Sequence, residues 1–173
     1  TDARDEDALR YLAEDIDWFL KHDAPYYQYK DHPRVTIVLL HYGETSARTL
    51  KALRNLAHTT YENFDILLVD NNSPDKFSER FEREVLPQIP ERLRERIRLI
   101  SNPANLGYTG ANNQAARLAL AAGSDYVLFF NNDALIEKDG IQKMIDAIKD
   151  RPEIGAASPG LWVYQEDGQA ESL

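Results

Sequence analysis

The stretch YVLFFNND, residues 126–133, joins five residues suited to a buried strand directly to three polar side chains. Similar apolar runs, rich in β-branched or aromatic residues, occur at 35–40, 64–69 and 97–100. Each run is apolar on both faces and too short for a typical helix, which is the pattern of strands in a parallel sheet covered on both sides. The sequence therefore predicts four buried parallel strands.

Segments with helical periodicity alternate with these strands, at residues 45–58, 76–89, 111–122 and 139–150. The alternation predicts an α/β fold, a three-layer sandwich around a mostly parallel central sheet. We expect Ser73-Pro74-Asp75 to cap and begin the helix at 76–89. We expect Gly123 to end the helix at 111–122 in the left-handed conformation. In PERLRERIRLI, the change from helix to strand should fall near Arg96.

The first 33 residues differ from the rest of the chain. Residues 4–22 carry apolar side chains at spacings of three or four, which predicts an amphipathic helix with Leu9, Leu12, Ile16 and Phe19 on one face. A linker with prolines and tyrosines follows. The sequence thus predicts an N-terminal helix and linker at 1–33 and one domain at 34–173. The helix at 4–22 could pack on that domain or contact a second chain.

The composition excludes several classes of protein. The chain has 173 residues, 43% of them hydrophobic, which suits one globular domain. It contains no cysteine, which excludes disulfides and thiolate-bound zinc and suits a reducing compartment. A net charge of −9 argues against a nucleic-acid partner. No apolar run reaches the roughly 20 residues of a membrane-spanning helix. We expect a cytoplasmic protein, or one at the inner face of the membrane in its full-length form.

Polar or glycine-bearing segments follow all four predicted strands. In open parallel sheets, ligands bind beyond the carboxyl ends of the strands, where the strand order reverses. The four segments should therefore gather at one edge and face a ligand crevice; they are His41-Tyr42-Gly43-Glu44, Asp70-Asn71-Asn72-Ser73, SNPANLGYTG at 101–110, and Asn131-Asn132-Asp133.

Two of these segments have both a functional and a structural interpretation. Asp70 could bind ribose hydroxyls or a base nitrogen, or it could form a turn that caps the next helix. The loop at 102–110 could present Gly107, Gly110 and a helix N-terminus to a phosphate, or its asparagines could satisfy their own backbone. Its glycine spacing matches neither the dinucleotide-binding fingerprint nor a P-loop, which disfavours NAD-dependent and P-loop chemistry.

Asn131, Asn132 and Asp133 offer only oxygen ligands to a metal. Mg²⁺ or Mn²⁺ would suit such a set, since these ions keep waters and share substrate phosphates. In an acidic protein, a divalent cation would also relieve the repulsion between carboxylates and a nucleotide diphosphate. The alternative is a polar turn in which Asp133 caps a helix.

Five segments in this order resemble the family 2 glycosyltransferases of the GT-A fold: VTIVLLHYGE, FDILLVDNNSPD, LISNPANLGYTGANNQAARLA, YVLFFNNDALI and IGAASPGLW. The sequence is most similar to the rhamnosyltransferase-like branch, over residues 34–162. The resemblance implies the nucleotide-diphosphosugar transferase fold. It also implies that Tyr42, Asp70, Gly107 and Asp133 converge around one nucleotide-sugar.

The resemblance assigns roles to individual residues. Tyr42 would lie near the base and ribose, Asp70 would hold either of them, and Asp133 would bind the metal. The remaining donor-binding residues would be Leu40, Gly43, Glu44, Asn105, Gly107, Asn112, Asn113, Asn131 and Asn132. Gly43 stands where many relatives have asparagine, and Asn131 where many have aspartate. The second difference would make metal binding depend more on the phosphates of the donor.

The implied reaction is transfer of a sugar from a nucleotide-diphosphate sugar to a hydroxyl of a saccharide or lipid-linked saccharide, inverting and metal-dependent, in cell-envelope polysaccharide biosynthesis. The family's acceptor side and catalytic base follow the fourth strand, so we expect them beyond Leu173 and the fragment to be inactive alone. Glu166, Asp167 and Glu171 are expected to be solvated, and His41 is a candidate base for which packing is the competing interpretation. The alternative function is a non-catalytic nucleotide-sugar-binding or interaction module.

Overall fold

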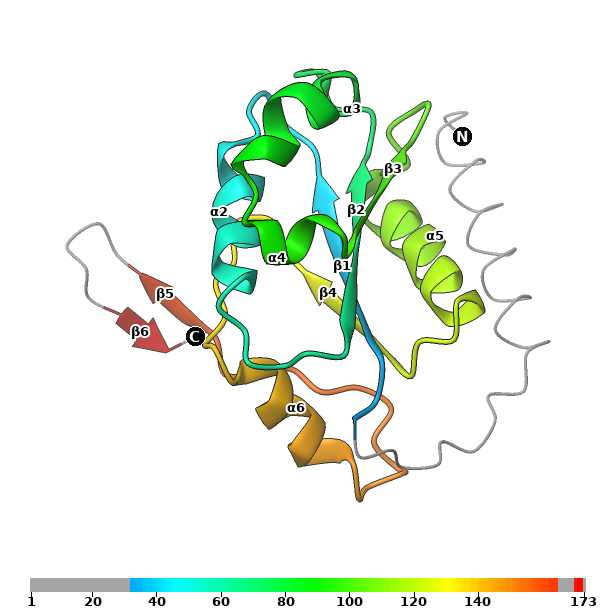
Figure 1. Cartoon of the computed structure of the whole chain (residues 1–173). Helices are drawn as coiled ribbons and strands as arrows, with labels where there is room; N and C mark the ends of the chain where they lie inside the picture. The colour runs from blue at the N-terminus through cyan, green and yellow to red at the C-terminus, as the bar shows by residue number, and fades with distance from the viewer. Residues whose placement is uncertain (1–31, 165–169, 173) are drawn as a thin grey trace.

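The computed structural model describes residues 32–164 and 170–172 (Figure 1). The predicted amphipathic helix at 4–22, the start of the linker, Glu166 and Asp167 lie outside the described residues. The separation of residues 1–33 from the domain at 34–173 therefore stays a prediction.

A four-stranded parallel sheet forms the centre of the fold. Its strands are β1 (Val35–His41), β2 (Phe64–Asp70), β3 (Ile97–Ser101) and β4 (Tyr126–Phe130), in the order β3-β2-β1-β4. All three neighbouring pairs are parallel, which confirms the predicted strands and their direction. The order reverses between β1 and β4, because β2 and β3 lie on one side of β1 and β4 on the other.

Helices cover both faces of this sheet, which confirms the three-layer sandwich. One face packs against α2 (Ala47–Leu56), α3 (Phe77–Arg80), α4 (Glu91–Arg94) and α6 (Gly140–Ile148). In the described part of the chain, α5 (Gly107–Ala121) covers the other face by itself (Figure 1). Here Val38, Leu67 and Val69 of the sheet pack against alanines of the helix, Ala111, Ala115 and Ala119.

The segment at 73–89 differs from the prediction of one helix capped by Ser73. Helix α3 begins at Phe77, and it is followed by the π-helical turn η1 (Phe81–Val85) and the 3₁₀ turn η2 (Leu86–Gln88). Lys76 precedes the helix with a left-handed backbone, φ 56°, so Ser73 belongs to a separate turn. Pro87 lacks a backbone N–H and cannot continue a regular α-helix, which accounts for the change near the end of the segment.

Most of the other expected boundaries are confirmed. Gly123 follows α5 with φ 83°, as predicted for a left-handed helix end. Helix α4 ends at Arg94 and β3 begins at Ile97, so the change from helix to strand falls near Arg96.

Two differences remain. Helix α5 begins four residues earlier than expected. The short antiparallel pair β5 (Trp162–Tyr164) and β6 (Ala170–Ser172), which contains Glu171, was not predicted. Among the described residues, no helix combines the length and apolar character needed to cross a bilayer.

Candidate functional site

A hollow of about 240 Å³ lies where the strand order reverses, at the carboxyl ends of β1 and β4. Parallel α/β sheets bind ligands at this position. The hollow collects residues from the end of β1, the end of β4 and the first turns of α5: Leu40, Tyr42, Tyr108, Asn112, Phe130, Asn131, Asn132 and Asp133. Six of these eight were predicted site residues, drawn together from three separate segments.

Two exposed aromatic rings line this hollow. Tyr42 and Tyr108 are 52% and 60% exposed, so their faces are available to a ligand. The Tyr108 hydroxyl also donates a hydrogen bond to Oδ1 of Asn131 at 3.2 Å. Nδ2 of Asn112 donates to the Tyr108 carbonyl oxygen at 2.9 Å, one turn earlier in α5. The first turns of α5 are thereby linked to the end of β4.

The oxygen atoms around Asp133 suit a metal cation that keeps several of its water ligands. Asp133 is exposed, and its neighbours Asn131 and Asn132 add amide oxygens to the same lining. Within the described ranges, no group of three or more His, Cys, Asp or Glu residues could hold a metal without help. Mg²⁺ or Mn²⁺ fits this set, because these ions bind through one or two carboxylates together with waters and substrate phosphates.

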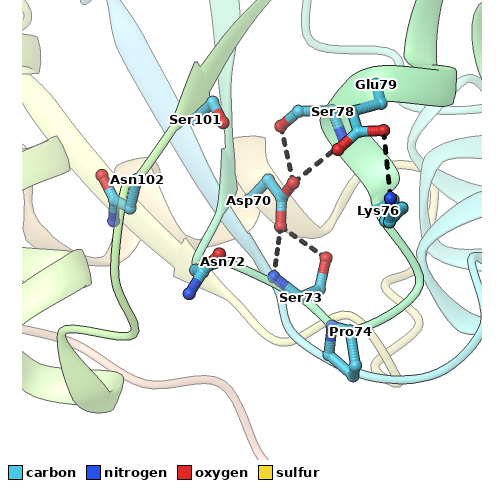
Figure 2. A pocket seen from close by; sticks show the side chains of 9 residues that line it. All are labelled: Asp70, Asn72, Ser73, Pro74, Lys76, Ser78, Glu79, Ser101 and Asn102. Carbon is cyan, nitrogen blue, oxygen red and sulfur yellow. Dashed lines mark hydrogen bonds and ion pairs between the residues drawn. The ribbon is translucent and has the colours of Figure 1, made fainter.

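A second hollow, of about 390 Å³, surrounds Asp70 at the end of β2. Strand β1 pairs His41 with Asp70, so the two hollows lie at the carboxyl ends of neighbouring strands. In Figure 2 the Asp70 carboxylate points to Ser73 and Ser78, and Asn102 lies on the opposite side. The complete lining is Asp70, Asn72, Ser73, Pro74, Lys76, Ser78, Glu79, Ser101 and Asn102.

All the accepting positions of the Asp70 carboxylate are occupied within the protein. Oδ1 accepts hydrogen bonds from the backbone N–H and the hydroxyl of Ser73, and Oδ2 accepts the same pair from Ser78. A carboxylate offers about four lone-pair sites. Asp70 therefore forms the capping turn that was one of its two predicted interpretations, and it fixes the loop between β2 and α3.

The protonation of Asp70 reflects the same hydrogen bonds. Asp70 is 4% exposed, and burial by itself raises the pKa of a carboxyl group. The hydrogen bonds from Ser73 and Ser78 together outweigh this effect and hold the pKa of Asp70 below its ordinary value. The charged carboxylate is thus the form that the loop stabilises.

Asn71, the next residue, joins this loop to the segment between β3 and α5. Its Nδ2 donates to Oδ1 of Asn105 at 2.7 Å and to the Gly107 carbonyl oxygen at 3.3 Å. Its Oδ1 accepts from Nδ2 of Asn102 at 3.1 Å and from the Leu106 N–H at 3.0 Å. Asn71 is 2% exposed, so its amide is a buried and fully bonded link between two loops.

The remaining predicted residues lie outside the two linings. Asn105 accepts the Gly107 N–H at 2.8 Å, so the asparagine satisfies its own loop in the manner of the structural interpretation. Gly107 adjoins Tyr108 and so lies beside the first hollow. Gly43, Glu44 and Asn113 line neither hollow. The expected convergence of Tyr42, Asp70, Gly107 and Asp133 is thus divided between two neighbouring hollows at one edge of the sheet.

His41 has the packing position that competed with its role as a base. It is fully buried, and its ring stacks on Phe77 with centroids 4.0 Å apart. Its two nitrogens contact Thr49 and Asp75, and it lines neither hollow.

Several residues of the two hollows were missed by the sequence analysis. Tyr108 and Phe130 line the first hollow, and Ser78 lines the second and donates to Asp70. Tyr108 had a usable signal, since it is an aromatic residue directly after a glycine in a loop already expected to face the ligand. Asn71 lies in a segment that was expected at this edge, but its role as a link between two loops had no signal, because its partners Asn102 and Asn105 lie more than 30 positions away in the chain.

Comparisons with known proteins agree on the fold. A sequence model described as glycosyl transferase family 2 matches residues 36–171. A solved structure of the mannosyltransferase PcManGT from Pyrobaculum calidifontis, in complex with GDP-Man and Mn²⁺, is 22% identical with a TM-score of 0.57. The match covers 86% of this chain and 42% of that one, so the chain spans less than half the length of this similar structure.

A weaker similarity is to TarS from S. aureus, residues 1–349 in complex with UDP. The two chains are 18% identical with a TM-score of 0.48, and the match covers 66% of this chain and 32% of TarS. A search of curated proteins found no significant match.

Proposed function

The chain belongs to glycosyl transferase family 2, and from that premise we propose that it binds the nucleotide-diphosphate sugar donor of a glycosyltransferase. The observation that carries this proposal is the hollow at the strand-order reversal. It combines one carboxylate, three amide side chains and two exposed tyrosines. Such a lining offers groups for a cation and for sugar hydroxyls.

The two hollows suggest how the donor is divided. The nucleoside would enter the hollow around Asp70, and the diphosphate and sugar would lie toward Asp133, at the neighbouring strand ends. Asp70 would act on the nucleoside by fixing the loop, because its accepting positions are already filled. Direct contacts in that hollow would then come from residues such as Asn72, Lys76 and Ser101.

Asp133, with Asn131 and Asn132 beside it, would hold Mg²⁺ or Mn²⁺. The cation would supply positive charge that neutralises the departing diphosphate. Two observations support a metal: the net charge of −9 would otherwise repel the donor, and the similar mannosyltransferase is in complex with Mn²⁺ as well as GDP-Man. The residues lining the two hollows would position the donor.

The full reaction would be transfer of the sugar to a hydroxyl of a saccharide or lipid-linked saccharide, with inversion, in cell-envelope polysaccharide biosynthesis. A rhamnosyltransferase-like specificity and a cytoplasmic location, at the inner face of the membrane in the full-length protein, belong to the same proposal. Among the described residues lining the first hollow, Asp133 is the one carboxylate and no histidine is present. We therefore assign no catalytic base to this chain, and a binding module without turnover is the second candidate.

Isothermal titration calorimetry with UDP-, dTDP- and GDP-sugars, with and without Mn²⁺, tests the proposal. We expect one class of donor to bind, and to bind more tightly with Mn²⁺. The variant Asp133→Asn should lose the effect of the metal. Asp150→Asn removes an exposed carboxylate outside both hollows and should behave as wild type. A folded chain that binds none of these donors would overturn the proposal.

An assay for release of the sugar separates the two candidates. Metal-dependent donor binding together with transfer or hydrolysis by the full-length protein would support the enzyme. The same binding without release of the sugar would support the module.

A further inference from the structure

We propose that Asp75, His41 and Thr49 are positioning residues: a buried chain of hydrogen bonds that they form with Asn132 turns the Asn132 carbonyl oxygen toward the hollow, as a fixed acceptor for the donor or its metal ion. This inference rests on the proposed function for the identity of the ligand. The hydrogen-bond chain itself does not depend on it.

The hydrogen-bond chain runs from Asp75, in the loop before α3, to the candidate site through two fully buried side chains. Nε2 of His41 lies 3.2 Å from Oδ1 of Asp75, and Nδ1 of His41 lies 2.7 Å from Oγ1 of Thr49. Oγ1 of Thr49 also lies 3.3 Å from Nδ2 of Asn132. His41 and Thr49 are both 0% exposed. Water therefore does not compete for the two hydrogen bonds of the His41 ring.

The hydrogen bond between Asp75 and His41 determines the direction of the other two. The Asp75 carboxylate can only accept, and its Oδ2 also accepts from Nη2 of Arg80 at 2.9 Å. Nε2 of His41 must therefore carry the hydrogen. In the neutral ring Nδ1 is then an acceptor, which takes the single hydroxyl hydrogen of Thr49.

The Thr49 hydroxyl donates its one hydrogen bond to His41, so its oxygen can only accept a hydrogen bond from Asn132. It therefore selects the amide nitrogen of Asn132, which is a donor, and disfavours the amide oxygen. The opposite orientation of the amide would place two acceptors at the 3.3 Å separation. Because the amide group is planar, its oxygen is directed away from the nitrogen that Thr49 holds.

The side-chain oxygen of Asn132 is free to bind a ligand in the hollow. Within the described ranges, no hydrogen bond is made to Oδ1 of Asn132, and the residue lines the hollow next to Asp133. A fixed carbonyl oxygen beside a carboxylate suits a Mg²⁺ or Mn²⁺ ion, one of its waters, or a sugar hydroxyl. Outer partners of this kind orient the groups that touch a metal or substrate.

Substitution of Thr49 tests the chain with a matched pair of variants. Thr49→Val keeps the shape and removes the hydroxyl, whereas Thr49→Ser keeps the hydroxyl. With a donor that binds wild type in the presence of Mn²⁺, we expect T49V to bind about tenfold or more weakly, the usual effect of losing such a partner. T49S should remain near wild type. Equal affinities for folded T49V and wild type would overturn the inference.

A second measurement decides the matter without any ligand and without a variant. The ¹⁵N chemical shifts of the His41 ring, assigned through its contact with Phe77, report which nitrogen carries hydrogen at neutral pH. Hydrogen on Nε2 alone supports the chain. Hydrogen on Nδ1, or on both nitrogens, overturns it, because Thr49 would then be free to donate to the Asn132 oxygen. If T49V does not fold, this result stands by itself.

The two proposals can fail separately. Absence of donor binding in wild type would overturn the proposed function and with it the ligand assigned to Asn132, whereas the wrong hydrogen pattern on His41 would overturn the positioning chain alone.

Discussion

Replacing Asp70 by asparagine keeps the size of the side chain and exchanges one carboxylate oxygen for an NH₂ group. In the structure each oxygen accepts one backbone N–H at 2.9 Å, from Ser73 or from Ser78, in addition to a hydroxyl. Whichever oxygen is exchanged, one of these backbone donors then faces another donor. The serine hydroxyl on that side can rotate to accept, but the backbone N–H cannot.

The expected cost follows from this geometry. A hydrogen bond to a charged group contributes about 1.5–3 kcal/mol, and a buried donor left without a partner costs about 1–3 kcal/mol. The two effects overlap, since they concern the same N–H, so we expect D70N to lower the free energy of unfolding by about 2–4 kcal/mol. This is a large part of the roughly 5–15 kcal/mol that typically stabilises a domain.

Urea unfolding followed by circular dichroism measures this difference. Asp65→Asn is the matched control, because Asp65 lies in the same strand but its side chain is 42% exposed and pairs with Arg34. Exposed ion pairs contribute at most about 1 kcal/mol, so D65N should change stability little. A D70N midpoint no lower than that of D65N would refute the capping role. Unchanged stability with lost donor binding would make Asp70 a direct ligand contact instead.

The dependence on pH gives an independent check of the same reasoning. Hydrogen bonds from the two serines hold the folded-state pKa of Asp70 below its ordinary value. The carboxylate therefore contributes its full stabilisation above that ordinary value, near 4, and loses it as the pH falls through the lowered pKa. The difference in stability between wild type and D70N should be full at neutral pH and shrink below about pH 4.

Three further substitutions have expected outcomes in the same unfolding assay. Asn71→Asp would place a carboxylate oxygen, which cannot donate a hydrogen bond, against Oδ1 of Asn105. We expect the free energy of unfolding to fall by about 2–4 kcal/mol and the nucleotide-sugar to bind more weakly. Stability equal to wild type would contradict the linking role of Asn71. Gly123→Ala should cost about 1–2 kcal/mol because φ is 83° there, whereas Gly155→Ala, with open space and no positive φ, should cost much less; equal effects would argue against backbone strain. Leu53→Ala removes a fully buried side chain from the larger core and should cost about 2–5 kcal/mol, and a loss below 1 kcal/mol would mean that the core closes over the cavity.

The strands were predictable because burial on both faces leaves a strong mark in the sequence. Ile37, Leu39 and Val38 face different cores, yet all three are buried, so the run shows no alternation. The helical period in the segment at 73–89 was also recognised. Its apolar residues Phe77, Phe81 and Val85 are buried although the helix type changes between them.

The local details were less predictable because they depend on contacts between distant residues. The start of α3 is set by Asp70, whose carboxylate accepts the Ser78 N–H; a cap formed by Asp70 was one interpretation of the sequence, but the sequence did not identify Ser78 as its partner. The expectation that ligands bind beyond the carboxyl ends of parallel strands correctly placed Tyr42 and Asp133 in one hollow. It did not supply Tyr108, which reaches the hollow through the placement of α5 across the sheet.

The alanines of α5 have a consequence for the width of the candidate site. Ala111, Ala115 and Ala119 are buried against Val38, Leu67 and Val69 of the sheet, so that small side chains on the helix let it pack close to the strands. Tyr108 and Asn112, which line the hollow, lie in the first turns of the same helix. These three alanines thus set the distance between α5 and the sheet, and with it the position of Tyr108 and Asn112. A bulkier side chain at any of the three would move the helix away from the sheet and widen the hollow, although none of the three lines it.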